Sequence, residues 1–281
     1  MGIGATSLKF LVYCKRNFDI NFTRTATLGR LQFAKTFSSA RLLKKHVLEP
    51  ALNLDEIFVD GFCEGVLKHM GAGLVESFDY SDYECATHIV DMNEPIDDSH
   101  KGKYTLLIDG GTSEHIFHVP NVYKNMMDMV EVGGHIICYV PTNNWCGHGF
   151  YQFSPELYFN LFAKERGFEI KTVAYGVGTS AGAGVKKLWE IPNPNETRKV
   201  VMLYTRRETM LFVCARKVSD SMEYPSPQQS MWEIEAWNAD GKPGLLKRLK
   251  KNRFLNAVLP ACFKQFAVKL ASRQRLKELK L

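Results

Sequence analysis

Short apolar runs that each end on an aspartate constrain the fold of this sequence more than any other feature. They are Gly73–Asp79, His88–Asp91 and Tyr104–Asp109, and each combines strand-forming residues with a terminal acid. Stretches with apolar residues at helical spacing, Leu54–Met70 and Asn121–Val130, lie before and after them. Strands that alternate with helices predict a parallel sheet with both faces covered.

The rest of the chain continues this alternation. Further helices are expected over Ala5–Lys15 and Ser154–Arg166, and further strands over Thr25–Leu28, His135–Val140, Phe168–Tyr175 and Thr209–Ala215. We therefore predict an α/β fold with a Rossmann-like, doubly wound, mostly parallel seven-stranded sheet, helices on both faces and a basic helical C-terminal tail. Ligands bind such sheets beyond the carboxyl ends of the strands, where the three aspartates lie.

Composition narrows the class of protein. The chain has 281 residues, 45% of them apolar and 23% charged, as in ordinary globular proteins. Its net charge of +6 comes from the segment after Lys242, which carries about a dozen basic residues beside the carboxylate of Glu278. The near-neutral body argues against a nucleic-acid-binding core. Seven cysteines without a C-x-x-C pair, and no run approaching about 20 apolar residues, predict a cytoplasmic protein.

The sequence divides into two expected parts. Residues 1–218 form the ligand-binding domain, with a polar insertion over about 30–55, and residues 219–281 form a linker and a basic amphipathic tail. The tail (Leu245–Leu281) alternates apolar residues with Lys and Arg, and Pro260 separates two expected helices. The tail either packs on the body with a solvated charged face or makes a peripheral contact with an anionic membrane.

One long segment resembles a known family. Residues 103–141, KYTLLIDGGTSEHIFHVPNVYKNMMDMVEVGGHIICYVP, resemble the fourth and fifth strands of class I S-adenosylmethionine (SAM)-dependent methyltransferases. That family has there a strand ending in Asp, a Glu-His pair, a helix and a Gly-Gly turn. SFDYSDYE (Ser77–Glu84), DMNEP (Asp91–Pro95) and GHGFYQFSPEL (Gly147–Leu157) resemble a narrower group of methyltransferase-like proteins. The resemblance implies that residues 1–218 bind SAM.

The resemblance also implies a role for each matching position. Asp79 would accept hydrogen bonds from the ribose hydroxyls, and Asp91 and Met92 would lie beside the adenine. Asp109 and Gly110 would border the methionine end of the cofactor. The implied cofactor-binding set is Gly29, Asp79, Tyr80, Asp91, Met92, Asp109 and Gly110.

Simpler explanations exist for some of these positions. Asp79 can be a solvated acid at a strand end, and the pattern Asp-x-Asn-x-Pro from Asp91 is also that of an ordinary Asx turn. Gly29 stands alone where the family has a Gly-rich loop after its first strand. Either the insertion over about 30–55 closes over the cofactor, or the pocket is degraded.

Glu114, His115 and His148 are the candidate catalytic residues. Histidine can take a proton near neutral pH, whereas a purely structural role is the alternative for all three. His148 lies in the loop Asn143–Phe153, whose four aromatic residues and amides predict an acceptor-recognition element. The sequence has no H-x-x-x-H pattern and no Cys/His cluster with ligand spacing, so no metal is predicted.

These observations predict a SAM-dependent methyltransferase that acts on a small-molecule or glycan acceptor, at oxygen. The acceptor class follows from the aromatic and amide side chains of the loop, which suit sugar faces and hydroxyls. The alternative is a non-catalytic binding or scaffold protein with the methyltransferase fold, peripheral to a membrane. The lone Gly29 motivates that alternative.

Overall fold

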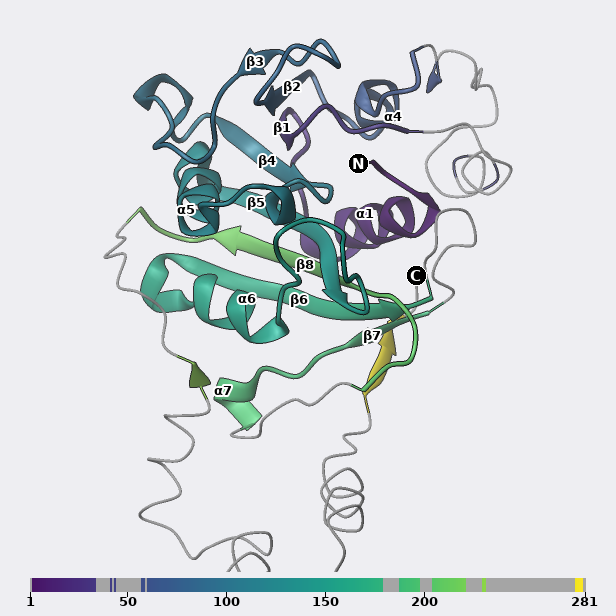
Figure 1. Ribbon diagram of the computed structural model, residues 1–281. Coiled ribbons are helices and arrows are strands. Elements are labelled where there is room, and N and C mark those ends of the chain that lie inside the picture. The colour runs from purple at the N-terminus through teal and green to yellow at the C-terminus, as the bar shows by residue number, and fades with distance from the viewer. Residues whose placement is uncertain are drawn as a thin grey trace, which may run out of the picture.

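The structure, a computed structural model, describes residues 2–33, 41, 43, 57–58, 60–178, 187–197, 204–220, 229–230 and 276–279 (Figure 1). Its elements in chain order are α1 (Ala5–Phe18), β1 (Arg24–Leu28), α4 (Glu64–His69), β2 (Leu74–Asp79), β3 (His88–Ile89), η1 (Asp98–His100), β4 (Tyr104–Asp109), η2 (Ser113–His115), α5 (Val119–Met129), β5 (Val130–Asn143), α6 (Pro155–Leu161), η3 (Lys164–Arg166), β6 (Phe168–Val177), β7 (Leu188–Glu190), α7 (Pro194–Thr197), β8 (Thr209–Lys217) and β9 (Lys277–Leu279). Within these described stretches, no helix is long and apolar enough to cross a membrane.

The nine strands of the described residues form one mixed sheet in the order β3-β2-β1-β4-β5-β8-β6-β7-β9. The strands from β3 to β5 pair in parallel, and every pair from β5 to β9 is antiparallel. The predicted α/β class is confirmed, but the prediction of seven mostly parallel strands is wrong. The two additional strands, β7 and β9, are three residues long and extend the edge beyond β6.

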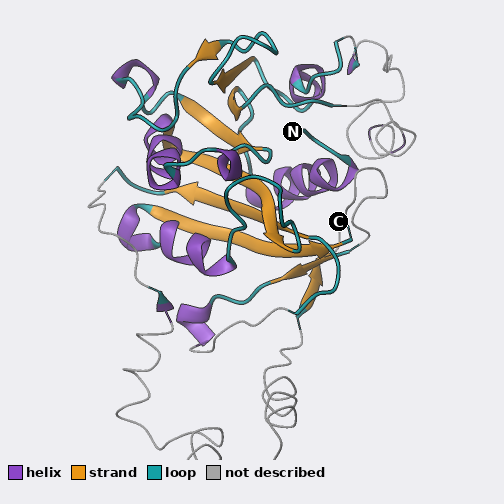
Figure 2. Cartoon of the chain, viewed as in Figure 1, coloured by secondary structure: helices purple, strands orange, loops and turns teal. Residues whose placement is uncertain are grey.

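The direction in which the sheet grows reverses between the neighbouring strands β1 and β4. α4, which follows β1, packs with α1 on one face of the sheet, whereas α5, which follows β4, packs with α6 on the other (Figure 1, Figure 2). Leu28 pairs with both Phe78 and Asp109, so three strands end level with one another at this edge. In a doubly wound sheet, such a reversal leaves a crevice between the two loops that follow it.

Two helices are shorter than predicted. α6 begins after Ser154, whose side chain accepts a hydrogen bond from the Glu156 N–H, as an N-cap does. It ends at Leu161, and a separate 3-10 turn precedes Gly167. In the continuous described part of the predicted helix Leu54–Met70, which begins at residue 60, α4 is the helix that forms. Gly61, just before it, has a φ of 80°, which is not a helical conformation.

β5 is longer than predicted, because it includes Gly133 and Gly134, which are expected from the sequence to form a turn. The strand is irregular at this point: its register with β4 shifts between residues 104 and 106. A Cβ atom at position 134 would lie 2.7 Å from a methyl carbon of Val130 and 3.0 Å from the carbonyl oxygen of Thr105. The glycine therefore allows a close backbone approach inside the sheet.

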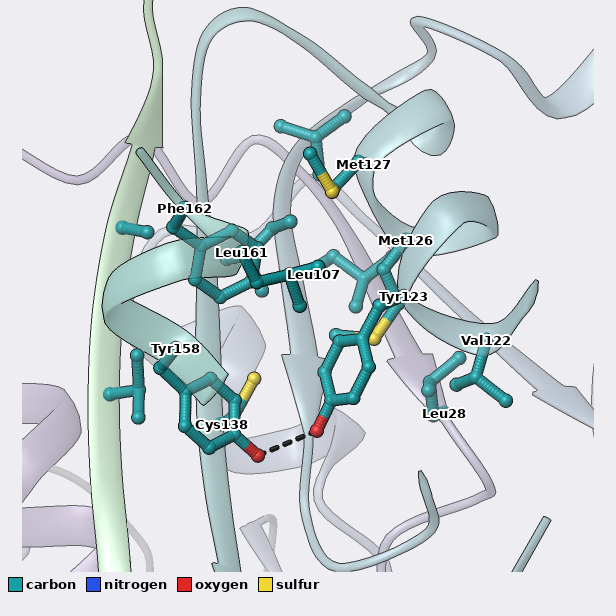
Figure 3. Packing of buried hydrophobic residues seen from close by; sticks show 14 of the residues in the cluster. Leu28, Leu107, Val122, Tyr123, Met126, Met127, Cys138, Tyr158, Leu161 and Phe162 are labelled. Atoms are coloured by element: carbon teal, nitrogen blue, oxygen red, sulfur yellow. Dashed lines mark hydrogen bonds between the residues drawn. The ribbon is translucent and has the colours of Figure 1, made fainter. Parts of the chain in front are cut away.

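Two hydrophobic clusters, one on each face of the sheet, form the core. Figure 3 shows the cluster under α5 and α6, where Tyr123 and Tyr158 share a hydrogen bond of 2.5 Å between their hydroxyl groups. The hydroxyl of Ser113 lies 3.4 Å from that of Tyr123. The loop after β4 is thereby connected to the buried tyrosine pair.

Most of the predicted insertion and tail lies outside the described residues. Of Leu245–Leu281, residues 276–279 are described, and Lys277–Leu279 pairs antiparallel with β7. Leu279 is buried against the face covered by α1. The prediction of helix is therefore wrong for these residues, whereas the domain division at residue 218 stays a prediction.

Candidate active site

The loop after β4 is folded around the carboxylate of Asp109. Its Oδ1 accepts hydrogen bonds from the N–H groups of Gly111 (3.2 Å), Thr112 (2.9 Å) and Ser113 (3.3 Å), and its Oδ2 accepts one of 2.5 Å from the Ser113 hydroxyl. Asp109 is fully buried, and this burial raises its pKa, although the hydrogen bonds act in the opposite direction. The carboxylate therefore holds the loop together, and its position at the methionine end of the cofactor stays a prediction.

The same loop is attached to the end of β1. The hydroxyl of Thr112 donates a hydrogen bond of 2.7 Å to the carbonyl oxygen of Leu28. Gly110 packs on Leu31, and a Cβ atom there would lie 2.7 Å from both of the leucine methyl carbons. The loops on the two sides of the reversal between β1 and β4 are thus joined directly.

Glu114 directs its carboxyl group into the protein. The residue is 1% exposed, and its Oε2 has no hydrogen-bond partner in the described part of the chain. Burial, and after it the charge of Asp109, raises the pKa of Glu114 to about 8. A carboxyl group with such a pKa can exchange a proton near neutral pH.

His115 and His148 lie beside this carboxyl group. Nε2 of His148 is 3.7 Å from Oε1 of Glu114, and the ring centroids of the two histidines are 4.9 Å apart. One ligand atom from each of the three residues lies within 4.8 Å of the others. Burial, and next the charge of His148, lowers the pKa of His115. The structure brings the three predicted catalytic residues together from two loops, and their catalytic roles stay predictions.

Backbone contacts fix the loop after β5 against Glu114. The N–H groups of Phe150 and Tyr151 donate hydrogen bonds of 2.7 and 3.2 Å to the carbonyl oxygen of Glu114. The Tyr151 hydroxyl donates one of 2.7 Å to the carbonyl oxygen of Phe117. The position of His148 relative to Glu114 is therefore set by the backbone and not by the side chains alone.

Exposed aromatic rings surround the cluster. Phe117 is 70% exposed and Phe150 67%, and their rings meet edge to face with centroids 5.9 Å apart. The indole of Trp145 lies 5.1 Å from the His148 ring and donates a hydrogen bond to the carbonyl oxygen of Thr209. Aromatic surface beside polar side chains suits a ligand that has both an apolar face and polar groups.

The acids after β2 and β3 form hydrogen bonds within their own turns. Oδ1 of Asp79 accepts a hydrogen bond of 2.7 Å from the N–H of Tyr80, whose side chain is 74% exposed. Oδ1 of Asp91 accepts bonds of 2.9 and 2.7 Å from the backbone and side-chain N–H groups of Asn93, as in an Asx turn. Met92 is 4% exposed and belongs to the core. The three aspartates are therefore held in separate loops, and their cofactor contacts stay predictions.

Arg30 is a residue of this edge that the sequence did not indicate. It follows Gly29 (φ 69°), and its guanidinium forms ion pairs with Asp60 (2.6 Å) and Glu64 (2.7 Å). It also donates a hydrogen bond of 3.1 Å to the carbonyl oxygen of Glu84, in the loop after β2. These partners lie 30 to 54 residues away in the chain, so no local pattern indicates them.

A separate hollow of about 350 Å³ lies against β6 and residues 190–193. Leu276 and Lys277 also line it. It contains none of the predicted site residues and does not include the carboxyl ends of β1 and β4. The chemistry-bearing side chains therefore lie at a different place from this hollow.

Several solved structures are similar to this one, and the following three are methyltransferases. An S-adenosylmethionine-dependent methyltransferase from Mesorhizobium loti is 13% identical, with 76% of this chain and 98% of that chain covered and a TM-score of 0.43. A geranyl diphosphate methyltransferase in complex with SAM is 12% identical, with 76% and 85% covered and a TM-score of 0.42. The Burkholderia thailandensis 1,6-didemethyltoxoflavin-N1-methyltransferase, with bound 1,6-didemethyltoxoflavin and S-adenosylhomocysteine, is 10% identical, with 77% and 79% covered and a TM-score of 0.37.

No protein-family model and no curated protein matches the sequence. The TM-scores of the three methyltransferases lie below 0.5, so no residue role is transferred from them to this chain. The fold class rests on the strand order and on the reversal between β1 and β4.

Proposed function

We propose that the chain is a SAM-dependent methyltransferase that methylates an oxygen atom of a small-molecule or carbohydrate-like acceptor. The observation that carries the proposal is the meeting of Glu114, His115 and His148 at the carboxyl ends of β4 and β5. The hydrogen bond from Thr112 to Leu28 connects this cluster to the reversal between β1 and β4. Doubly wound sheets bind their ligands at that edge.

Asp79 and the turn at Gly29 are the residues that fit the cofactor. Asp79 uses only Oδ1 in its hydrogen bonds to described residues, which leaves Oδ2 for a ribose hydroxyl. Gly29 has a positive φ and no side chain, so the backbone can approach a ligand closely there. When bound, SAM supplies a methyl group that its sulfonium already activates.

His148 is the residue that we assign to the acceptor proton. Its side chain is 44% exposed, so it can contact an acceptor while its Nε2 lies beside Glu114. As the acceptor oxygen formed its bond to the methyl carbon, the S–C bond would break with its electron pair left on sulfur as a thioether, and the O–H proton would pass to the imidazole of His148. The pKa of Glu114 is raised to about 8, so its carboxyl group is ionised, and stabilises the resulting imidazolium charge, toward alkaline pH.

The aromatic rings supply the acceptor specificity in this proposal. Phe117 and Phe150 form an exposed pair beside the histidines, and such rings pack on the apolar faces of sugars and small ring compounds. Replacing Phe150 with Ala is expected to raise KM for the acceptor and to leave S-adenosylhomocysteine binding unchanged. Val132→Ala, at an exposed apolar position near the amino end of β5, is the control and is expected to change neither quantity.

Calorimetry with S-adenosylhomocysteine tests the proposed cofactor. The full chain is expected to bind it with a micromolar Kd, and Asp79→Ala is expected to weaken binding by about 1–3 kcal/mol, the loss of hydrogen bonds to a charged group. Asp98→Ala, in η1 before the amino end of β4, is the matched control. Unchanged affinity in Asp79→Ala would remove Asp79 from the site.

One observation favours a second candidate function. Arg30, with its ion pairs to Asp60 and Glu64, lies directly after Gly29, where the related enzymes are expected to have glycine-rich backbone. A well-folded chain that does not bind S-adenosylhomocysteine would indicate a non-catalytic binding or scaffold protein. With either function we also propose a cytoplasmic location and a peripheral membrane contact of the basic tail. Liposome flotation of the full chain against a chain truncated after Asp240 tests the contact.

A further inference from the structure

The cluster of Glu114, His115 and His148 has the composition of a metal site. It offers one carboxylate and two imidazoles, whose ligand atoms lie within 4.8 Å of one another. Carboxylate oxygens and imidazole nitrogens bind Zn²⁺ at about 2.0–2.2 Å, so at the tetrahedral angle two ligand atoms on one ion lie roughly 3.4 Å apart. Side-chain rotations that move the ligand atoms by less than about 1 Å would therefore close the cluster around an ion.

The buried carboxyl group of Glu114 gives an independent reason to expect a cation. Glu114 is 1% exposed, and its Oε2 has no hydrogen-bond partner among the residues that the structure describes. A buried carboxylate without a partner is costly, and buried charges in proteins are paired or bind metals. The fully buried Asp109 nearby adds a second acid to the surroundings of the site.

The ligands are also held in place before any ion binds. Glu114 and His115 belong to η2, whereas His148 belongs to the loop after β5, and the backbone hydrogen bonds from Phe150 and Tyr151 join the two segments. Sites whose ligands are positioned by the surrounding backbone bind metals more tightly than flexible ones. The two segments meet at the backbone carbonyl group of Glu114, which is itself one of the three ligand residues.

We propose that Glu114, His115 and His148 bind one divalent transition-metal ion of the class of Zn²⁺, Fe²⁺ or Co²⁺. Two imidazoles and one carboxylate favour these ions, whereas Mg²⁺ and Ca²⁺ prefer ligand sets made of oxygen atoms. Three protein ligands leave at least one coordination position open. His148 is 44% exposed and its ring lies 5.1 Å from that of Trp145, so the site can be reached from the solvent.

The open position fits an oxygen atom of the acceptor. An ion there would lower the pKa of an acceptor hydroxyl, so that its proton would be released to water, because a His148 nitrogen bound to the ion could not accept it. This role of the ion rests on the proposed methyl transfer. The binding of the ion does not rest on it, because it follows from the three ligands alone.

Titration of the chelator-treated full chain with Co²⁺ tests the site, with the visible absorption of bound Co²⁺ and equilibrium dialysis as readouts. We expect one Co²⁺ per chain in the wild type, displaced by Zn²⁺, and a loss of affinity of more than about tenfold in His115→Ala and in His148→Ala. Glu114→Gln is expected to have the same effect. Circular dichroism of each variant shows whether it is folded, and the two exposed histidines keep the test informative if the buried Glu114 variant does not fold.

Two control variants separate this site from adventitious binding. His118→Ala removes an exposed histidine three residues after His115, and Cys146→Ser removes an exposed thiol two residues before His148. Both are expected to bind Co²⁺ as the wild type does. A wild type that binds no Co²⁺, equal binding in His115→Ala and His148→Ala, or loss of binding in Cys146→Ser would each overturn the proposal.

Binding of S-adenosylhomocysteine is measured on the same samples. A wild type that binds S-adenosylhomocysteine but no Co²⁺ would overturn the metal site and leave the proposed cofactor in place. Binding of Co²⁺ without S-adenosylhomocysteine would do the reverse. The two proposals can therefore fail separately.

Discussion

A Cβ atom at position 149 would lie 2.8 Å from the carbonyl oxygen of Glu114, so Gly149 is in direct contact with the backbone of the buried acid. In the chain, Gly149 lies between His148 and Phe150. The N–H groups of Phe150 and Tyr151 donate hydrogen bonds to the same carbonyl oxygen of Glu114. Gly149 also has a φ of 72°, which favours glycine. Residue 149 therefore controls how closely the two loops of the site approach each other.

Gly149→Ala is expected to separate the two loops, because the added methyl group meets a backbone atom that cannot rotate away. We expect Co²⁺ affinity to fall by about tenfold or more and the free energy of unfolding to fall by roughly 1–3 kcal/mol. Dialysis and urea unfolding measure the two effects. Gly147→Ala is a matched control, because Gly147 also has a positive φ (86°) but a Cβ atom there meets nothing within 4 Å.

Gly147→Ala is expected to lose only the roughly 1–2 kcal/mol that the left-handed conformation costs a residue with a side chain. Its Co²⁺ affinity is expected to stay close to that of the wild type. Equal loss of affinity in the two variants would mean that backbone strain, and not the contact with Glu114, is responsible.

Tyr158→Phe is expected to destabilise the protein by about 1–3 kcal/mol, because it leaves the buried hydroxyl of Tyr123 without its hydrogen bond of 2.5 Å. The double variant Tyr123→Phe/Tyr158→Phe is expected to lose less than the sum of the two single variants, since neither hydroxyl then remains unpaired. Urea unfolding measures all three. Tyr175→Phe, at a half-buried position of β6 between β8 and β7, is expected to change stability by less than about 0.5 kcal/mol. Strict additivity of the two single variants would argue against the interaction between Tyr123 and Tyr158.

Lys217→Met is expected to lower the free energy of unfolding by at least about 2 kcal/mol. The ammonium group of Lys217 is buried and donates hydrogen bonds to the carbonyl oxygens of Met127 (3.1 Å) and Val130 (2.9 Å), which methionine cannot satisfy. Thermal and urea unfolding measure the loss. Lys171→Met, which breaks a partly exposed pair with Glu169, is the control, with an expected change below about 1 kcal/mol.

The stability of the wild type is expected to fall between pH 6.5 and about pH 4 because of His135. Burial, and next the charges of Arg216 and Lys171, lowers the pKa of His135 from 6.5 to about 4, while Asp19 and Glu169 act weakly in the opposite direction. Between these two values the unfolded chain binds a proton that the folded chain does not. Unfolding is therefore favoured as the pH falls, by up to about 3 kcal/mol for this group, and the full contribution is present above pH 6.5.

Urea unfolding of the wild type and of His135→Val at pH 7 and pH 4.5 tests this prediction. On going from pH 7 to pH 4.5, the wild type is expected to lose more stability than His135→Val, because valine does not bind a proton. A difference that is the same at both pH values would contradict the lowered pKa. The comparison between the two proteins cancels the titration of the other histidines.

The central strands could be predicted because their signals are local. β4 is buried on both faces, so its six residues form one apolar run with an unmistakable end at Asp109. β7 and β9 have three residues each and lie at the edge, where partly exposed residues leave no such run. Gly133 and Gly134 predict a turn but lie within β5, because glycine in an irregular strand and glycine in a turn look alike in the sequence.

The site could be predicted only in part, for a physical reason that differs between residues. A strand-terminal aspartate looks the same in the sequence whether it contacts a ligand or caps its own loop, and the buried hydrogen bonds by which Asp109 caps its loop are visible only in the structure. Glu114 and His115 are neighbours in the chain, but their approach to His148 depends on the path of the loop after β5. That path is set by backbone hydrogen bonds, which any residue type except proline can donate.

The hydrogen bond from Thr112 to the carbonyl oxygen of Leu28 has a thermodynamic consequence. It joins the carboxyl end of β1, which precedes the proposed cofactor turn at Gly29, to the loop that carries Glu114 and His115, so that ordering one of these segments orders part of the other. If a bound ion tightens nucleoside binding by some factor, the nucleoside must tighten ion binding by the same factor, because linkage between two binding equilibria is reciprocal. Thr112 is the position at which that cooperativity can be weakened with both sets of binding groups left intact.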